Sequence, residues 1–170
     1  MRVFKEEQRF TQTWLLILLG ISVIIPILVL FKNFYEENSN MSLEDLLLSS
    51  AFIIVWIIPI YFLKLTTRID ETGIHFQFFP FHLSLKTISW SALKVAQTRT
   101  YDAISEYGGW GLKGDFLRKK GKRYAYTVSG NSGLQLTFKN GKHILIGTQK
   151  QEDVRLILTT YASKITNNEN

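Results

Sequence analysis

The sequence predicts an α+β membrane protein, in which a two-helix transmembrane hairpin is followed by a roll of seven antiparallel strands and a capping C-terminal helix. Two uncharged apolar runs, at residues 14–31 and 46–63, predict the hairpin. In the following chain apolar and polar residues alternate, which predicts short strands. Near the C-terminus the alternation ends, and apolar residues recur at the three- and four-residue spacing of an amphipathic helix.

The positive charge of the chain is concentrated in its C-terminal part. The 170 residues have a formal net charge of +6, and residues 64–170 hold sixteen of the twenty Lys and Arg residues. The chain has no cysteine, which excludes a disulfide framework, a cysteine zinc site and a cysteine nucleophile.

Residues 1–13 are expected to form a basic N-terminal tail ahead of the first membrane helix, at about residues 14–31. Eighteen helical residues span about 27 Å, close to the hydrocarbon thickness of a bilayer. A pair of buried core helices is the alternative, but a domain this small could not cover both. The first run also exceeds the apolar length of a cleaved signal peptide, so we expect it to be retained.

The second membrane helix is expected at about residues 43–63, because Ser42 and Asp45 have the spacing of a capping box. An acidic loop at residues 32–42 joins the two helices. Basic residues precede the first run, at Arg2, Lys5 and Arg9, and follow the second run, at Lys64 and Arg68. The positive-inside rule therefore predicts a multi-pass protein with both termini in the cytoplasm. Neither run holds Asp, Glu, Lys, Arg or His, which favours an anchor over a transport path.

Residues 64–170 are expected to form a cytoplasmic domain. The seven predicted strands cover about residues 65–69, 74–78, 83–89, 93–100, 124–128, 134–138 and 143–147. Asn140-Gly141 is the strongest turn signal between them. Thr148 and Gln151 have capping-box spacing and open the terminal helix, whose predicted apolar stripe is Val154, Ile157, Leu158, Tyr161, Ala162 and Ile165.

This order of elements resembles the small bacterial membrane proteins that carry a pleckstrin-homology-like (PH-like) domain. The local features behind the resemblance are Ile69-Asp70-x-x-Gly73-Ile74, Ile88-Ser89-Trp90, Gly108-Gly109-Trp110-Gly111, and Gly133-Leu134-x-Leu136 with Ile146-Gly147-Thr148. The resemblance covers nearly the whole chain and implies a bacterial inner-membrane binding or assembly module, often oligomeric. None of these motifs is a catalytic signature.

The stretch at residues 101–123 lacks strand alternation and is the most informative segment for function. Its Gly109 to Gly114 spells G-x-G-x-x-G, but no helix pattern follows and the neighbouring strands are antiparallel, so we do not expect a nucleotide site. We expect turns around an anchored Trp110. The predicted contact residues are Trp110, Lys113, Arg118, Lys119, Lys120, Lys122 and Arg123.

Three interpretations of this basic cluster stay open: contact with anionic lipid headgroups, contact with another membrane protein, or a solvated loop. Nucleic acid is not expected as a partner, because no nucleic-acid-binding module is present. No catalytic, metal or cofactor site is predicted. The three histidines fall on different strands or turns and are expected on exposed faces. Asp102 and Glu106 would share a helical face, but the adjoining glycines argue against a helix there.

The leading hypothesis is thus a membrane-anchored, non-catalytic binding or scaffold protein. One alternative is an enzyme acting on a lipid or membrane substrate, with Asp102, Glu106 or His143 contributing. Another is a ring-forming homo-oligomer whose hairpins assemble a pore.

Overall fold

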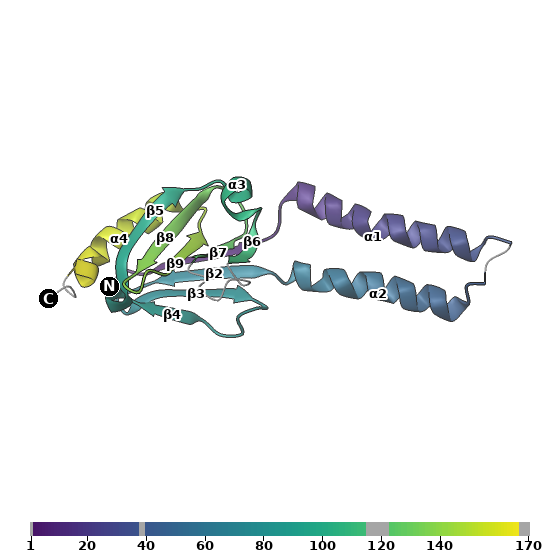
Figure 1. The fold of residues 1–170 in the computed structure, drawn as a ribbon, viewed down its shortest axis with the longest axis horizontal. Helices are drawn as coiled ribbons and strands as arrows, with labels where there is room; N and C mark the ends of the chain where they lie inside the picture. Colours follow the sequence, from purple (N-terminus) through teal and green to yellow (C-terminus); the bar gives the residue numbers. More distant parts are fainter. Residues whose placement is uncertain (1, 38–39, 115–122, 167–170) are drawn as a thin grey trace. The chain divides into compact units, whose positions relative to one another are not determined.

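A computed structural model describes residues 2–37, 40–114 and 123–166. It divides the chain into two units, a helical hairpin at Phe10–Leu63 and a sheet unit that combines Met1–Arg9 with Lys64–Asn170. Figure 1 shows the elements of both units. The sheet unit is therefore discontinuous in sequence, and the hairpin is inserted into it.

The hairpin consists of α1 (Thr13–Phe34) and α2 (Leu43–Tyr61). Both helices are long and apolar enough to cross a membrane, with mean hydropathies of 2.9 and 2.0. The predicted capping box of α2 is confirmed: Ser42 Oγ accepts from the Asp45 N–H at 3.1 Å, and Asp45 Oδ2 accepts from the Ser42 N–H at 3.1 Å. No residue of α1 and only Leu46 of α2 is buried, so most apolar side chains of the hairpin are exposed or half-buried.

The first sheet of the sheet unit has four antiparallel strands in the order β1 (Phe4–Arg9), β2 (Lys64–Ile69), β3 (Gly73–Phe79) and β4 (Lys86–Ser89). A single 3₁₀ turn at Trp90–Ala92 leads to the second sheet. The Trp90 indole donates to the Asp70 carbonyl at 3.0 Å and lies 5.4 Å from the Tyr161 ring, so this corner joins the first sheet to the C-terminal helix.

Strand β1 lies within the segment that was expected to be a tail. It pairs with β2 along its whole length, from Phe4 opposite Ile69 to Arg9 opposite Lys64. Its inward positions include Glu6 and Gln8, which are buried although polar. Glu6 accepts from Thr148 Oγ1 at 2.6 Å and from the Gln149 N–H at 2.8 Å, and Gln8 donates to the Gly147 carbonyl at 2.8 Å. The buried polar side chains of β1 thus find their hydrogen-bond partners more than 130 residues away in the sequence.

The second sheet has five strands in the order β5-β8-β9-β7-β6. Their bounds are β5 (Leu93–Thr100), β6 (Gly111–Gly114), β7 (Arg123–Thr127), β8 (Ser132–Phe138) and β9 (His143–Gly147). All neighbours are antiparallel except β7 and β9, which run parallel. The predicted turn at Asn140-Gly141 is confirmed, since Gly141 has φ +78° and the Phe138 N–H donates to the Lys142 carbonyl at 2.8 Å.

The strand count differs from the prediction. Strands are present at all seven predicted places, although the third covers only Lys86–Ser89 and not residues 83–85. With β1 and β6 the described residues form nine strands, the second sheet is mixed, and the two sheets are not closed into a roll. The segment between β5 and β7 also contains a short helix, α3 (Ala103–Tyr107). The argument from glycine against this helix was wrong, because Gly108 adopts the left-handed conformation that ends it, at φ +69°.

The C-terminal helix α4 (Gln151–Thr166) packs along β5 and β8 (Figure 1). Four residues of the predicted stripe are buried: Val154, Ile157, Leu158 and Tyr161. The apolar face of the second sheet includes Leu134, Leu136, Ile144 and Ile146. The helix packs on the β5 and β8 part of the sheet, whereas Tyr126 of β7 lies against Phe76 and Phe78 of the first sheet. The opposite face of that sheet is free to carry polar side chains.

Candidate functional site

The register of the second sheet places a set of polar side chains on one face. Directly opposed residues of neighbouring strands point to the same side of a sheet. The ladder registers therefore place one set of paired residues on a single face of the second sheet. The pairs are Gln97–Gln135, Gln135–Leu145, Lys113–Ala125 and Arg123–His143. We call this surface the polar face, defined by Gln97, Arg99, Lys113, Arg123, Gln135, Thr137 and His143.

Part of the same side is covered by the segment that contains α3. An apolar cluster forms there from Tyr101, Ala103, Ala125 and Leu145, with Tyr107 and Trp110 packed against it. The Trp110 indole also donates to the Gly130 carbonyl at 2.8 Å. The half-buried Trp110 thus anchors its segment to the sheet.

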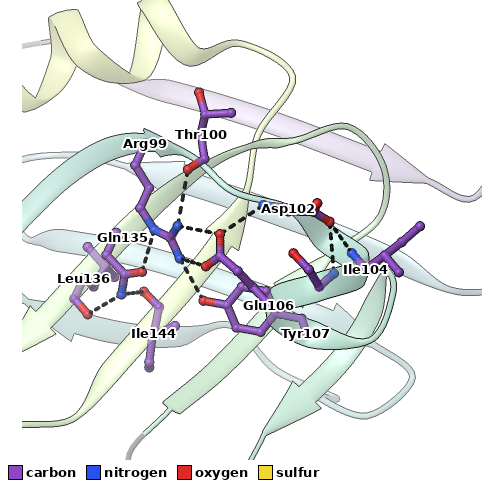
Figure 2. Close-up of polar contacts among 10 residues, drawn as sticks. Arg99, Thr100, Asp102, Ile104, Glu106, Tyr107, Gln135, Leu136 and Ile144 are labelled. Carbon is purple, nitrogen blue, oxygen red and sulfur yellow. Dashed lines mark hydrogen bonds and ion pairs between the residues drawn. The ribbon is translucent and has the colours of Figure 1, made fainter.

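Arg99 fastens α3 to the sheet through all five of its N–H donors (Figure 2). Nη1 and Nη2 bind Glu106 Oε1 and Oε2 at 3.1 and 2.7 Å. The remaining donors bind the Thr100 carbonyl at 3.2 Å, the Tyr107 hydroxyl at 3.1 Å and Gln135 Oε1 at 3.1 Å. The guanidinium therefore joins β5, α3 and β8, and its charge is balanced by Glu106.

The two acidic residues of this region have structural tasks. The Arg99 side chain, together with the Asp102 N–H, holds the pKa of Glu106 below its ordinary value. Asp102 caps α3: its Oδ1 accepts from the N–H groups of Ser105 and Ile104, and these bonds lower the pKa of Asp102. Both carboxylates are thus ionised and engaged near neutral pH, which does not suit a general acid or base.

A cleft of about 1060 Å³ opens on the polar face. Among its lining groups are Arg99 and Glu106 on one side, Lys113 and Arg123 on another, and Gln135 and His143. The described charged groups of the lining are three cations and one carboxylate. Since Arg99 and Glu106 balance each other, Lys113 and Arg123 set the local charge. The cleft is thus suited to an anion.

The structure brings some of the predicted contact residues together. Lys113 and Arg123 line the same cleft, whereas Trp110 packs against the apolar cluster and is not among the lining residues. The other predicted contacts, Arg118, Lys119, Lys120 and Lys122, lie outside the described residues. Sequence reasoning missed Arg99 and Gln135. The period-two polar residues within two predicted strands, Gln97 and Arg99 in one and Gln135 and Thr137 in the other, were the available signal.

The histidines differ in environment. His143 lies on the polar face, with Nδ1 at 3.2 Å from Thr137 Oγ1. His82 is buried, contrary to expectation, and its ring lies against Phe76 and Tyr126. His75 contacts Asp70 Oδ1 through Nε2 at 3.1 Å and Thr87 through Nδ1 at 2.9 Å.

The cluster around Asp70 fastens the β2–β3 turn. Burial alone would raise the pKa of Asp70, but hydrogen bonds from Thr72 and His75 outweigh it and hold the pKa far below its usual range. Within residues 2–37, 40–114 and 123–166, no group of three or more His, Asp or Glu side chains could hold a metal ion.

In comparisons with known proteins, neither a family model nor a curated protein matches the chain.

Proposed function

We propose that the chain is a membrane-anchored, non-catalytic binding module, which holds a PH-like sheet domain at the cytoplasmic face of a bacterial inner membrane. The observation that carries this proposal is the insertion of the α1–α2 hairpin between two paired strands. Arg9 at the end of β1 lies opposite Lys64 at the start of β2. The segments that enter and leave the hairpin therefore belong to one sheet.

This pairing supports a two-span topology. Strands β1 and β2 can pair only if both lie on the same side of the membrane, and two spans return the chain to the side from which it entered. The two apolar helices have the length for this path. The basic residues beside the hairpin, Arg9, Lys64 and Arg68 among them, favour the cytoplasmic side.

The arrangement of the sheet unit supports the PH-like interpretation. Two sheets of four and five strands precede a C-terminal helix, and that helix packs along β5 and β8 of the second sheet. The additional strands β1 and β6 and the parallel pair β7–β9 are features of this chain beyond the expected seven-stranded pattern.

The polar face supports a binding function. Its cleft offers two cations that Glu106 does not balance, whereas Glu106 and Asp102 are engaged in holding α3. The ligand that we propose for the module is an anionic group, from a lipid headgroup or from another partner of the membrane protein.

The topology is tested by labelling single cysteines in a chain that has none of its own. Asn40→Cys lies in the loop between the helices, and Lys150→Cys lies at the exposed start of α4. In spheroplasts, a membrane-impermeant maleimide should label the first variant, and should label the second only after permeabilisation. Labelling of Lys150→Cys in intact spheroplasts, or release of the protein by alkaline carbonate, would contradict the proposal.

A further inference from the structure

We infer, resting on the proposed function, that the cleft on the polar face binds a phosphate monoester through Lys113, Arg123 and His143. These residues come from three strands, β6, β7 and β9, and all three line the cleft. Arg123 and His143 are direct partners in the parallel ladder. Lys113 lies on the same side of the sheet, opposite Ala125.

Each of these side chains has hydrogen-bonding capacity that the described residues leave unused. The exposed Arg123 guanidinium makes no hydrogen bond or ion pair with any residue in the described part of the chain. Lys113 Nζ donates to the Gly108 carbonyl at 3.3 Å, which leaves two of its three N–H groups. His143 uses Nδ1 toward Thr137, and Nε2 has no partner among the described residues.

The charge of the cleft matches that of a phosphate monoester. Arg99 is balanced by its bidentate pair with Glu106, so two net positive charges remain on Lys113 and Arg123. A phosphate monoester carries about −1.5 to −2 charges at pH 7 and three acceptor oxygens. Arg fits two of these oxygens with parallel N–H donors, while Lys and the imidazole supply single donors. A carboxylate would satisfy only part of this set.

The walls of the cleft are held in place before any ligand binds. Arg99 fixes Gln135 and α3, as Figure 2 shows, and Gln135 also donates to the Ile144 carbonyl at 3.3 Å. Strand β6, which carries Lys113, is paired with β7 along its four residues. The strands that carry the three side chains therefore need little ordering on binding, and the conformational entropy that is lost belongs to the side chains themselves. The volume of about 1060 Å³ also leaves room for the group to which the phosphate is attached.

The phosphate group could belong to a lipid or to a soluble metabolite, and two probes distinguish these sources. The full-length chain in detergent micelles is titrated with glycerol 3-phosphate by calorimetry. In parallel, native mass spectrometry compares the retention of phosphatidic acid, a monoester lipid, with that of phosphatidylglycerol, a diester lipid. Binding of phosphatidic acid alone identifies a lipid ligand, and binding of glycerol 3-phosphate identifies a ligand that needs no acyl chains.

The test variant is Lys113→Gln combined with Arg123→Gln, and the matched control is Lys86→Gln combined with Lys94→Gln. The control removes the same charge from two exposed residues that do not line the cleft. We expect the test variant to weaken binding of the monoester probe by about tenfold or more, as for the loss of charge-assisted hydrogen bonds. The control should change it less than about twofold, as for remote surface charges.

Three results would overturn the inference: neither monoester probe binds the wild-type chain, the control variant loses as much affinity as the test variant, or phosphatidylglycerol is retained as strongly as phosphatidic acid. The third result would indicate a general attraction to anionic lipid. Carbonate extraction of the membranes from which the protein is solubilised reports separately on the anchor. A protein that resists extraction but binds no monoester refutes the phosphate site alone, whereas an extractable protein refutes the proposed membrane module.

Discussion

Replacement of Arg99 by Met tests whether this residue fastens α3 to the second sheet. Methionine keeps much of the aliphatic stem but removes all five donors to Thr100, Glu106, Tyr107 and Gln135. The Arg99 and Glu106 side chains are 30% and 38% exposed, so solvent screens the ion pair. We assign about 1 kcal/mol to the bidentate pair. About 0.5 kcal/mol is added for each of the bonds to Tyr107 and Gln135.

The expected loss is therefore about 2 kcal/mol of unfolding free energy for Arg99→Met, or roughly 8 °C in Tm for a unit of this size. Lys94→Met is the control, because Lys94 lies exposed on the same strand and does not line the cleft. It should change the unfolding free energy by less than about 0.5 kcal/mol. The assay is thermal and urea unfolding of the full-length chain in detergent, with amide hydrogen exchange at residues 103–108 as the local readout.

A double-mutant cycle with Glu106→Gln isolates the pair itself and should give a coupling energy of about 1 kcal/mol. The amides of Glu106 and Gly108, which donate to Asp102 and Ile104 carbonyls, should exchange faster in Arg99→Met and at the wild-type rate in Lys94→Met. Equal stability of the two variants, or a coupling energy near zero, would refute the role of Arg99 as a clamp.

Three further predictions concern the sheet unit. Glu6→Ala should lower the unfolding free energy by roughly 2–3 kcal/mol, because it leaves a buried donor at Thr148 and a partly buried one at Gln149 without their acceptor. Thermal unfolding should show no comparable loss for the exposed neighbour Glu7→Ala. Burial, with a smaller effect from Lys86, lowers the pKa of His82 below its ordinary value of 6.5, so the unfolded chain binds the proton more readily and stability should fall as pH drops below about 6.5. In urea unfolding between pH 7.5 and 5.5, the unfolding free energy of His82→Asn should change less with pH than that of the wild-type chain. An unchanged slope of free energy against pH would exclude His82 as the cause of the pH dependence. Gly133→Ala should lower the unfolding free energy by roughly 1–3 kcal/mol and reduce the Tm, because its Cβ would lie 2.9 Å from Cδ1 of the fully buried Leu145. An unchanged Tm would show that Leu145 can move aside.

The seven strands with apolar alternation were predictable because their inward residues, such as Leu65, Phe76 and Leu136, are apolar. Strand β1 was not, since two of its three inward residues are Glu6 and Gln8. Burial of these groups depends on Thr148, Gln149 and Gly147, which no local pattern connects to the N-terminus. The missed strand β6 is four residues long with glycine at both ends, so it has too little pattern to be recognised.

The candidate site was predictable only in part. Lys113 and Arg123 stood out as members of a basic cluster, and both line the cleft. The contributions of Arg99, Gln135 and His143 follow from the strand order β5-β8-β9-β7-β6, in which β7 pairs with β9 rather than with β8. Long-range register of this kind is set by tertiary packing, and turn signals do not report it. Gly108 is a local example of an ambiguous signal. A glycine disfavours the interior of a helix, but in the left-handed conformation it ends the short helix α3 favourably.

The most direct test of the central claim is a disulfide cross-link between β1 and β2 in native membranes. Lys5 and Arg68 are exposed partners in the register, on strands that precede and follow the hairpin. The variant carries Lys5→Cys and Arg68→Cys in an otherwise cysteine-free chain. Oxidation of carbonate-washed membranes should form a disulfide between the two positions, which mass spectrometry detects after digestion as a linked pair of peptides. The shifted pair Lys5→Cys with Thr72→Cys should not form the link. Absence of the Lys5–Arg68 link in membranes that retain the protein would contradict a hairpin inserted between paired strands on one side of the bilayer.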